Sequence, residues 1–179
     1  RLVVAGEEFP GWTRWEPESC LLTPSDAWSL AAPNIGGLLA GKFSPGMEAK
    51  LVLDGAVVMK GRIDEVSLKD GEIEVQGRDE ISFLLDCSAD PGTRQKISLL
   101  TMARALSEPW GITWAVQTGL ALGLHASVKI GPGQPRWDVL ATMAKKDRVL
   151  LWCEPDGTGM IGRPNYTADI ACKLCRVIP

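Results

Sequence analysis

The sequence has few of the residues that metal sites and catalytic centres usually require. Its 179 residues include a single histidine, His125. The pair Cys172 and Cys175 has no second pair to complete the four ligands of a structural zinc site, and no G-x-S-x-G motif marks a nucleophile that His125 would serve as base. The glycine-rich stretches 36–41 and 131–135 lack the residues of phosphate-binding loops. We therefore predict no catalytic residue, no metal site and no cofactor.

Several other features are also missing. No strongly basic segment exists and the net charge is −3, so the composition argues against binding duplex DNA through its phosphates. No apolar run reaches the roughly 18 residues needed to cross a bilayer, which predicts no membrane span. Five scattered cysteines do not form a secreted disulfide framework. Because the chain starts at Arg1 and ends without a polar tail, we expect a piece of a longer protein.

The clearest structural pattern lies between Ser44 and Asp79. Three turn pairs separate runs of alternating apolar and polar residues, which predicts an antiparallel meander of β-strands. The alternation shifts by one residue at Asp64 and Glu65, and this shift predicts a β-bulge. The turn pairs are Pro45-Gly46, Asp54-Gly55 and Asp70-Gly71, and the predicted inner face carries Met47, Ala49, Leu51, Leu53, Val57, Met59, Ile63, Val66 and Leu68.

Bulged and twisted strands curl readily into small barrels. We therefore predict an α+β protein with an N-terminal antiparallel β-barrel at 1–88 and a smaller α/β domain at 89–179. Further barrel strands are expected at Leu2–Ala5 and from Trp12 onward. The small residues of 29–46 predict a loop across one end of the barrel.

The apolar period changes to about three and a half in the second half, which predicts helices. After a short helix through Ile81 and Leu85, helices are expected around 97–106 and 137–144, each followed by a strand, at 112–116 and 149–153. The triplets Thr101-Met102-Ala103 and Thr142-Met143-Ala144 match, and either a weak helix-strand duplication or chance explains the match.

Large aromatic and acidic residues are the remaining candidates for function. Trp12, Trp15 and Trp28 are predicted to be interface residues, because tryptophan anchors many protein contacts. Trp114 and Trp152 fall on the apolar sides of their strands and are expected in the core. The acidic pairs Asp64-Glu65 and Asp79-Glu80 are interpreted as solvated turn and bulge residues.

Several short motifs follow one another along the chain. They are Phe9-Pro10-Gly11-Trp12-Thr13, Phe43-Ser44-Pro45-Gly46, Gly61-Arg62-Ile63-Asp64, Gly77-Arg78-Asp79, Leu85-Asp86-Cys87-Ser88-Ala89 and the run from Leu99 to Ile112. In their order and spacing they resemble those of the baseplate hub proteins of Mu-like contractile-tailed phages and prophages, also described as late control or tail hub proteins. The sequence departs from the family at Arg62, where the family carries tyrosine.

The resemblance implies a structural protein and no enzyme. It implies a homotrimer whose barrels form a ring between the tail tube and the central spike, with a channel for DNA and no sequence-specific DNA binding. The location would be the virion tail baseplate, after synthesis in the host bacterial cytoplasm. Family members are longer and add a second barrel. Two alternatives stay open: a tail-associated cell-wall hydrolase or carbohydrate-binding module, and the hub-like base of a contractile secretion spike.

Overall fold

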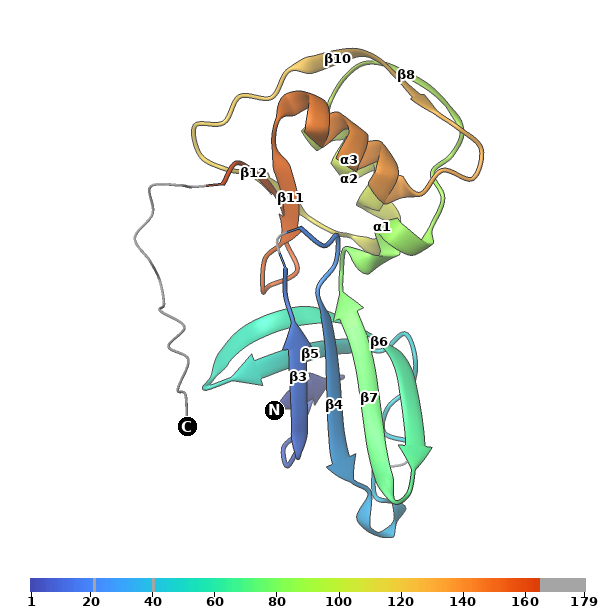
Figure 1. The fold of residues 1–179 in the computed structure, drawn as a ribbon, viewed down its shortest axis with the longest axis vertical. Helices are drawn as coiled ribbons and strands as arrows, with labels where there is room; N and C mark the ends of the chain where they lie inside the picture. Colours follow the sequence, from blue (N-terminus) through green and yellow to red (C-terminus); the bar gives the residue numbers. More distant parts are fainter. Residues whose placement is uncertain (21, 40, 165–179) are drawn as a thin grey trace, which may run out of the picture.

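The computed structural model describes residues 1–20, 22–39 and 41–164, and it contains a curved sheet below an α/β unit of similar size (Figure 1). The sheet has seven antiparallel strands in the order β2-β1-β5-β6-β7-β4-β3. Its strands are β1 Leu2–Val4, β2 Glu7–Phe9, β3 Arg14–Glu18, β4 Ala27–Pro33, β5 Glu48–Leu53, β6 Ala56–Lys69 and β7 Glu72–Asp79.

The predicted meander is confirmed as β5, β6 and β7. Asp54-Gly55 and Asp70-Gly71 form the two hairpin turns, and all four residues have positive φ angles between 49° and 84°, as two-residue turns of this hand require. The register shifts between Ile63 and Glu65, so the predicted bulge is present.

A second register shift, between Leu51 and Val52, was not predicted. Beyond that point, toward the hairpin turn, residues that strict alternation would direct to the core are directed to solvent instead. Leu53 and Val57 are therefore exposed, at 52% and 41%, and Val52 is buried instead. Leu68, near the far end of β6, is 59% exposed as well. The predicted inner face is wrong at Leu53 and Val57, because alternation alone does not reveal where a ladder is interrupted. Leu68 keeps the predicted phase, since it pairs with the buried Ile73, although its own side chain is exposed.

The prediction of a closed barrel is wrong. Among the described residues the sheet stays open, with β2 and β3 as its outer strands. Closure needs a continuous ladder between these two edges, but β2 has only three residues, and β3 contains Pro17, which has no N–H to donate.

The predicted loop at 29–46 is also wrong in its first part. Residues up to Pro33 belong to β4, which pairs with both β3 and β7. Trp28, Leu30 and Ala32 are buried on its inner face. The true loop follows, with the short 3-10 turn η1 at Ile35–Gly37. Small residues resemble a loop in sequence, yet they suit a strand that is covered on both sides.

The upper unit alternates helices and strands. The helices confirm the predicted order, and Ser98 caps α2 by accepting a hydrogen bond from the Thr101 N–H at 3.2 Å. The elements are α1 Ser82–Asp86, β8 Gly92–Ser98, α2 Leu99–Ser107, η2 Glu108–Trp110, β9 Trp114–Val116, β10 Leu124–Ile130, α3 Arg136–Asp147, β11 Leu150–Cys153 and β12 Gly159–Gly162.

Two small sheets flank these helices. One has the order β11-β12-β9, in which β12 pairs parallel with β9, and the other is the two-stranded ribbon β8–β10, which was not predicted. Trp114 is buried as expected, whereas Trp152 is only half-buried and its ring lies over Gly162.

Each unit has its own apolar core. The lower core includes Leu30, Leu51 and Val75, and the upper core includes Leu99, Leu140 and Ile161. Helix α1 contributes Ile81 and Leu84 to the upper core. The division of the chain into 1–88 and 89–179 stays a prediction.

Candidate functional site

The end of strand β7 carries the most unusual polar residues of the described chain. Asp79 and Glu80 are only 3% and 5% exposed, so the interpretation of this pair as solvated is wrong. They lie where β7 passes from the sheet into α1 (Figure 1), and the upper unit covers them. By contrast Asp64 and Glu65 are exposed at the bulge, as expected.

Asp79 organises the junction between the two units through its carboxylate. Its oxygens accept hydrogen bonds from Ser25 Oγ at 2.7 Å, the Asp26 N–H at 2.9 Å and the Ile81 N–H at 3.0 Å. Burial raises the pKa of Asp79, although these hydrogen bonds act in the opposite direction. The side chain therefore ties β7, α1 and the loop before β4 together.

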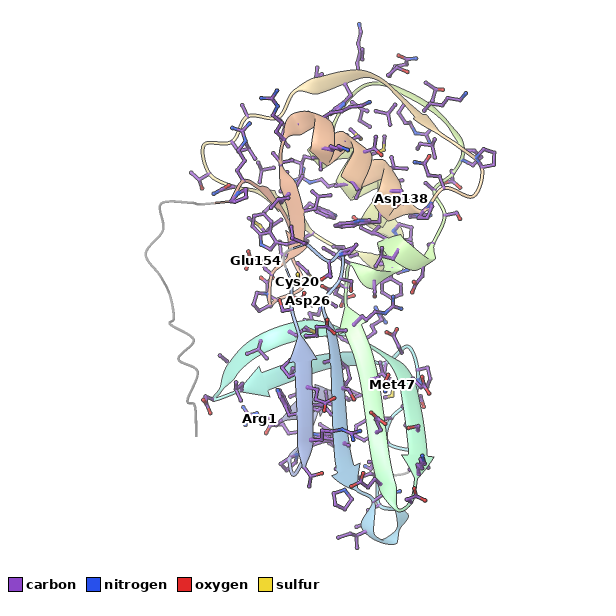
Figure 2. All side chains as sticks on the ribbon, in the orientation of Figure 1. Arg1, Cys20, Asp26, Met47, Asp138 and Glu154 are labelled. Atoms are coloured by element: carbon purple, nitrogen blue, oxygen red, sulfur yellow. The ribbon has the colours of Figure 1, made fainter. Side chains whose placement is uncertain are left out.

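The neighbouring loop is held by Asp26. Its carboxylate accepts hydrogen bonds from Ser19 Oγ at 2.6 Å and from the Cys20 N–H at 3.1 Å. Figure 2 labels Cys20, Asp26 and Glu154, and all three lie at the level where the sheet meets the upper unit. The loop thus links the end of β3 to the start of β4 beneath β11.

Glu80 faces two cations from strand β6. Lys60 Nζ lies 3.5 Å from one carboxylate oxygen and Arg62 Nε lies 3.8 Å from the other. Glu80 Oε2 and Arg62 Nε are both buried without a hydrogen-bond partner in the described residues. Arg62 also lies over the Phe83 ring, 5.1 Å from its centroid, so it connects the sheet to α1.

The β11–β12 hairpin reaches down onto the sheet at the same place. A Cβ added to Gly157, which has a φ of 91°, would lie 3.2 Å from both Lys60 Cδ and Glu80 Cγ. Burial, followed by the nearby charges of Asp79 and Glu80, raises the pKa of the Cys153 thiol. Because the thiolate is the nucleophile, Cys153 is unsuited to covalent catalysis.

A cavity of about 340 Å³ opens beside these residues, and it is bordered mainly by apolar side chains. It lies between β3, the tip of the β5–β6 hairpin and the β11–β12 hairpin. Its lining includes Trp15, Pro17, Leu53, Met59, Cys153 and Pro155. Asp26, Asp79 and Glu154 are its acidic members, and within the described residues no group of three or more potential metal ligands forms.

The three predicted interface tryptophans occupy different environments. Trp28 is buried in the lower core and stacks over Gly77, where a Cβ would lie 2.4 Å from the ring. Trp12 and Trp15 are half-buried against the same core, and Trp12 Nε1 donates to the Phe9 carbonyl at 2.8 Å. Both side chains can pack against the lower core because Trp12 lies before β3, so the alternation of side chains along that strand does not apply to it. Their role in an interface stays a prediction.

The remaining candidates do not meet at this site. His125 pairs with Asp147 at 3.0 Å and ties β10 to α3 in the upper unit. Cys172 and Cys175 lie outside the described residues. Over residues 1–20, 22–39 and 41–164, no helix is both long and apolar enough to cross a membrane.

Two family models match the chain in succession. The model for the Mu phage baseplate assembly protein GpP-like, N-terminal, matches residues 1–79, and the model for the baseplate hub protein gp44-like, second domain, matches residues 82–163. The chain belongs with the baseplate hub proteins of Mu-like phages. A structural role in the phage tail baseplate follows.

Solved structures of tail proteins agree with this assignment. A tail protein from Neisseria meningitidis is 28% identical with a TM-score of 0.79, and the match covers 94% of this chain and 52% of that protein. The 43 kDa tail protein of prophage MuSo2 from Shewanella oneidensis is 25% identical with a TM-score of 0.76, covering 92% and 54%. This hub chain therefore spans about half the length of these relatives.

A more distant neighbour shares only the fold. It is an Escherichia coli component of the type VI secretion system, 12% identical with a TM-score of 0.67, and the match covers 90% of this chain and 48% of that one. Among curated protein sequences none matches the hub chain.

Proposed function

We propose that the chain assembles as a homotrimer whose curved sheets form a ring joining the tail tube to the central spike. The observation that carries this proposal is the succession of two baseplate family models along one chain. The ring would enclose a channel for DNA. A net charge of −3 favours release of phosphates over their retention.

The open sheet supports self-association. Strands β2 and β3 leave backbone N–H and C=O groups without a ladder partner on their outer sides, and such edges pair readily with another chain. A heterologous contact repeated around a rotation axis closes into a ring. Trp12 and Trp15, near the edge strand β3, are the proposed anchors, whereas Trp28 serves the core.

The proposed role involves no reaction, no metal and no cofactor. Burial raises the pKa of the Cys153 thiol, and the Asp64 carboxylate at the bulge forms an ion pair with Arg78 at 2.6 Å. We place synthesis in the host bacterial cytoplasm before incorporation into the tail. The base of a contractile secretion spike is the second candidate, because the E. coli secretion component shares the fold.

Light scattering coupled to size-exclusion chromatography tests the proposal. Three chains of 19.3 kDa give a particle of about 58 kDa. If the particle keeps the mass of one chain at every protein concentration up to about 100 micromolar, any self-association is weak. That result would argue against self-assembly.

A further inference from the structure

Charge is divided unevenly along the described part of the hub chain. Residues 1–88 contain 15 acidic and 8 basic residues, and residues 89–164 contain 6 acidic and 9 basic residues, which gives net charges of −7 and +3. The negative charge lies mainly on the sheet and the positive charge on the upper unit, so the two units carry opposite signs.

The positive end includes the ribbon β8–β10, which lies at the far end of the molecule from the sheet (Figure 1). Arg94, Lys96 and Lys129 of the ribbon are exposed. None of them takes part in an ion pair among the described residues. The sequence between Asp90 and Asp138 contains a single acidic residue, Glu108. The ribbon therefore presents cations that its own neighbourhood does not neutralise.

The ribbon is also incompletely paired. Its inner face packs Val128 and Ile130 into the upper core, while its outer face carries Ser127 and Lys129 toward solvent. Both outer edges lack a strand partner in the described part of the chain. Lys96 has a φ of 48°, a left-handed conformation that is unfavourable for lysine in a strand. A strained, exposed and charged element of this kind is a reasonable candidate for a contact surface.

A complementary surface lies on the outer face of the sheet. Glu16 and Glu18 are exposed on the edge strand β3, beside an open hollow of about 450 Å³ that also contains Glu74. Arg14 of the same strand pairs with Glu74 at 2.8 Å and lies 3.9 Å from Glu16, so this face has three carboxylates and one cation. The floor of this hollow is formed by short side chains of β4, including Ala27 and Ser29. Long cationic side chains can enter such a hollow and reach the carboxylates at its rim.

We propose that the ribbon of one copy docks against the acidic outer face at β3 of a second copy. The inference rests on the proposed self-assembly and specifies which surfaces meet. The ribbon and the acidic face are separate surfaces on the two units of one molecule, so each copy would offer one surface to each of two neighbours. That is the arrangement of a cyclic, heterologous contact. Arg94 and Lys129 would pair with Glu16 and Glu18.

Charge reversal and its compensation test the pairing. We expect R94E/K129E to weaken self-association of the full chain about tenfold or more, and E16K/E18K to do the same, because each places like charges opposite one another. Combining all four substitutions should restore association to within about threefold of the original chain. K145E/K146E is the matched control, since Lys145 and Lys146 are exposed on α3 and belong to neither strand of the ribbon, so their reversal should have no effect.

The outcomes separate this inference from the proposed function. Association that survives R94E/K129E unchanged overturns the docking surface and leaves the ring intact. Failure of the four-substitution variant to recover overturns the acidic face as the partner. A chain that never associates refutes the ring and the docking together. Binding of a fluorescent DNA duplex that R94E/K129E abolishes, without any effect on association, would assign the ribbon to nucleic acid instead. Circular dichroism melts confirm that each variant is folded.

Discussion

Asp79 and Ser25 are hydrogen-bonded at the end of the sheet that adjoins the upper unit, with Ser25 Oγ donating to the Asp79 carboxylate at 2.7 Å. The two residues are 54 positions apart in the sequence. The bond joins the end of the sheet's central hairpin to the loop that leads into β4. A buried carboxylate thus fixes the loop before β4 and the start of α1 to the end of β7, where the sheet meets the upper unit.

Replacing Asp79 with alanine should destabilise the fold. Three donors would lose their acceptor in a buried place, which we expect to lower the free energy of unfolding by about 2 to 3 kcal/mol. Urea denaturation measures the change. Glu72→Ala is the control, because Glu72 is exposed on the same strand, and it should cost less than about 0.5 kcal/mol. Equal effects of the two substitutions would show that Asp79 does not hold the junction.

The raised pKa of Asp79 predicts a pH dependence. The folded state binds the Asp79 proton more readily than the unfolded state does, so this group's contribution is complete below the unfolded value of 3.8 and is lost as pH rises through the folded pKa. Asp79→Asn removes this titration. The stability difference between the original chain and the variant should shift against the original chain as pH rises, and a constant difference would contradict the assignment.

Gly157→Ala should disturb the contact of the β11–β12 hairpin with the sheet. The added methyl group would press on Lys60 and Glu80 at 3.2 Å. Gly55→Ala is a matched control, because Gly55 has a similar φ of 84° and nothing within 4 Å of the added atom. Both substitutions carry backbone strain, so the extra loss of melting temperature for Gly157→Ala isolates the contact. No extra loss would mean that the hairpin tip yields without cost.

The three tryptophans should separate core packing from assembly. Trp28→Ala empties a buried position and should cost about 3 to 5 kcal/mol of stability. Trp12→Ala and Trp15→Ala remove half-buried rings, and loss of an interface anchor should shift the particle toward a monomer while the fold survives. Light scattering and thermal melts on the same samples distinguish these results. A drop in melting temperature without any change in mass would assign Trp12 and Trp15 to the core.

Much of the sheet could be predicted because its strands alternate. The bulge at Asp64 changed the phase of the apolar residues, and both Asp-Gly turns carried their own conformational preference. Strand β4 was missed because Ala31, Ala32 and Pro33 resemble a loop. The ribbon β8–β10 was missed because its exposed strand carries mostly polar residues and few apolar ones.

The site was harder to predict for a different reason. Asp79 and Glu80 are acidic residues after a strand, and nothing local distinguishes them from Asp64 and Glu65. Their burial arises because the upper unit, more than 70 residues later in the chain at Gly157, packs over them. Barrel closure likewise depends on whether two distant edges meet, which strand alternation does not encode.

Electron microscopy of the assembled particles tests the central claim most directly. If three chains form a wall segment of the baseplate hub, class averages will show closed rings with threefold symmetry and a central opening. Compact particles without an opening, or open chains of varying length, would contradict the ring and the role built on it.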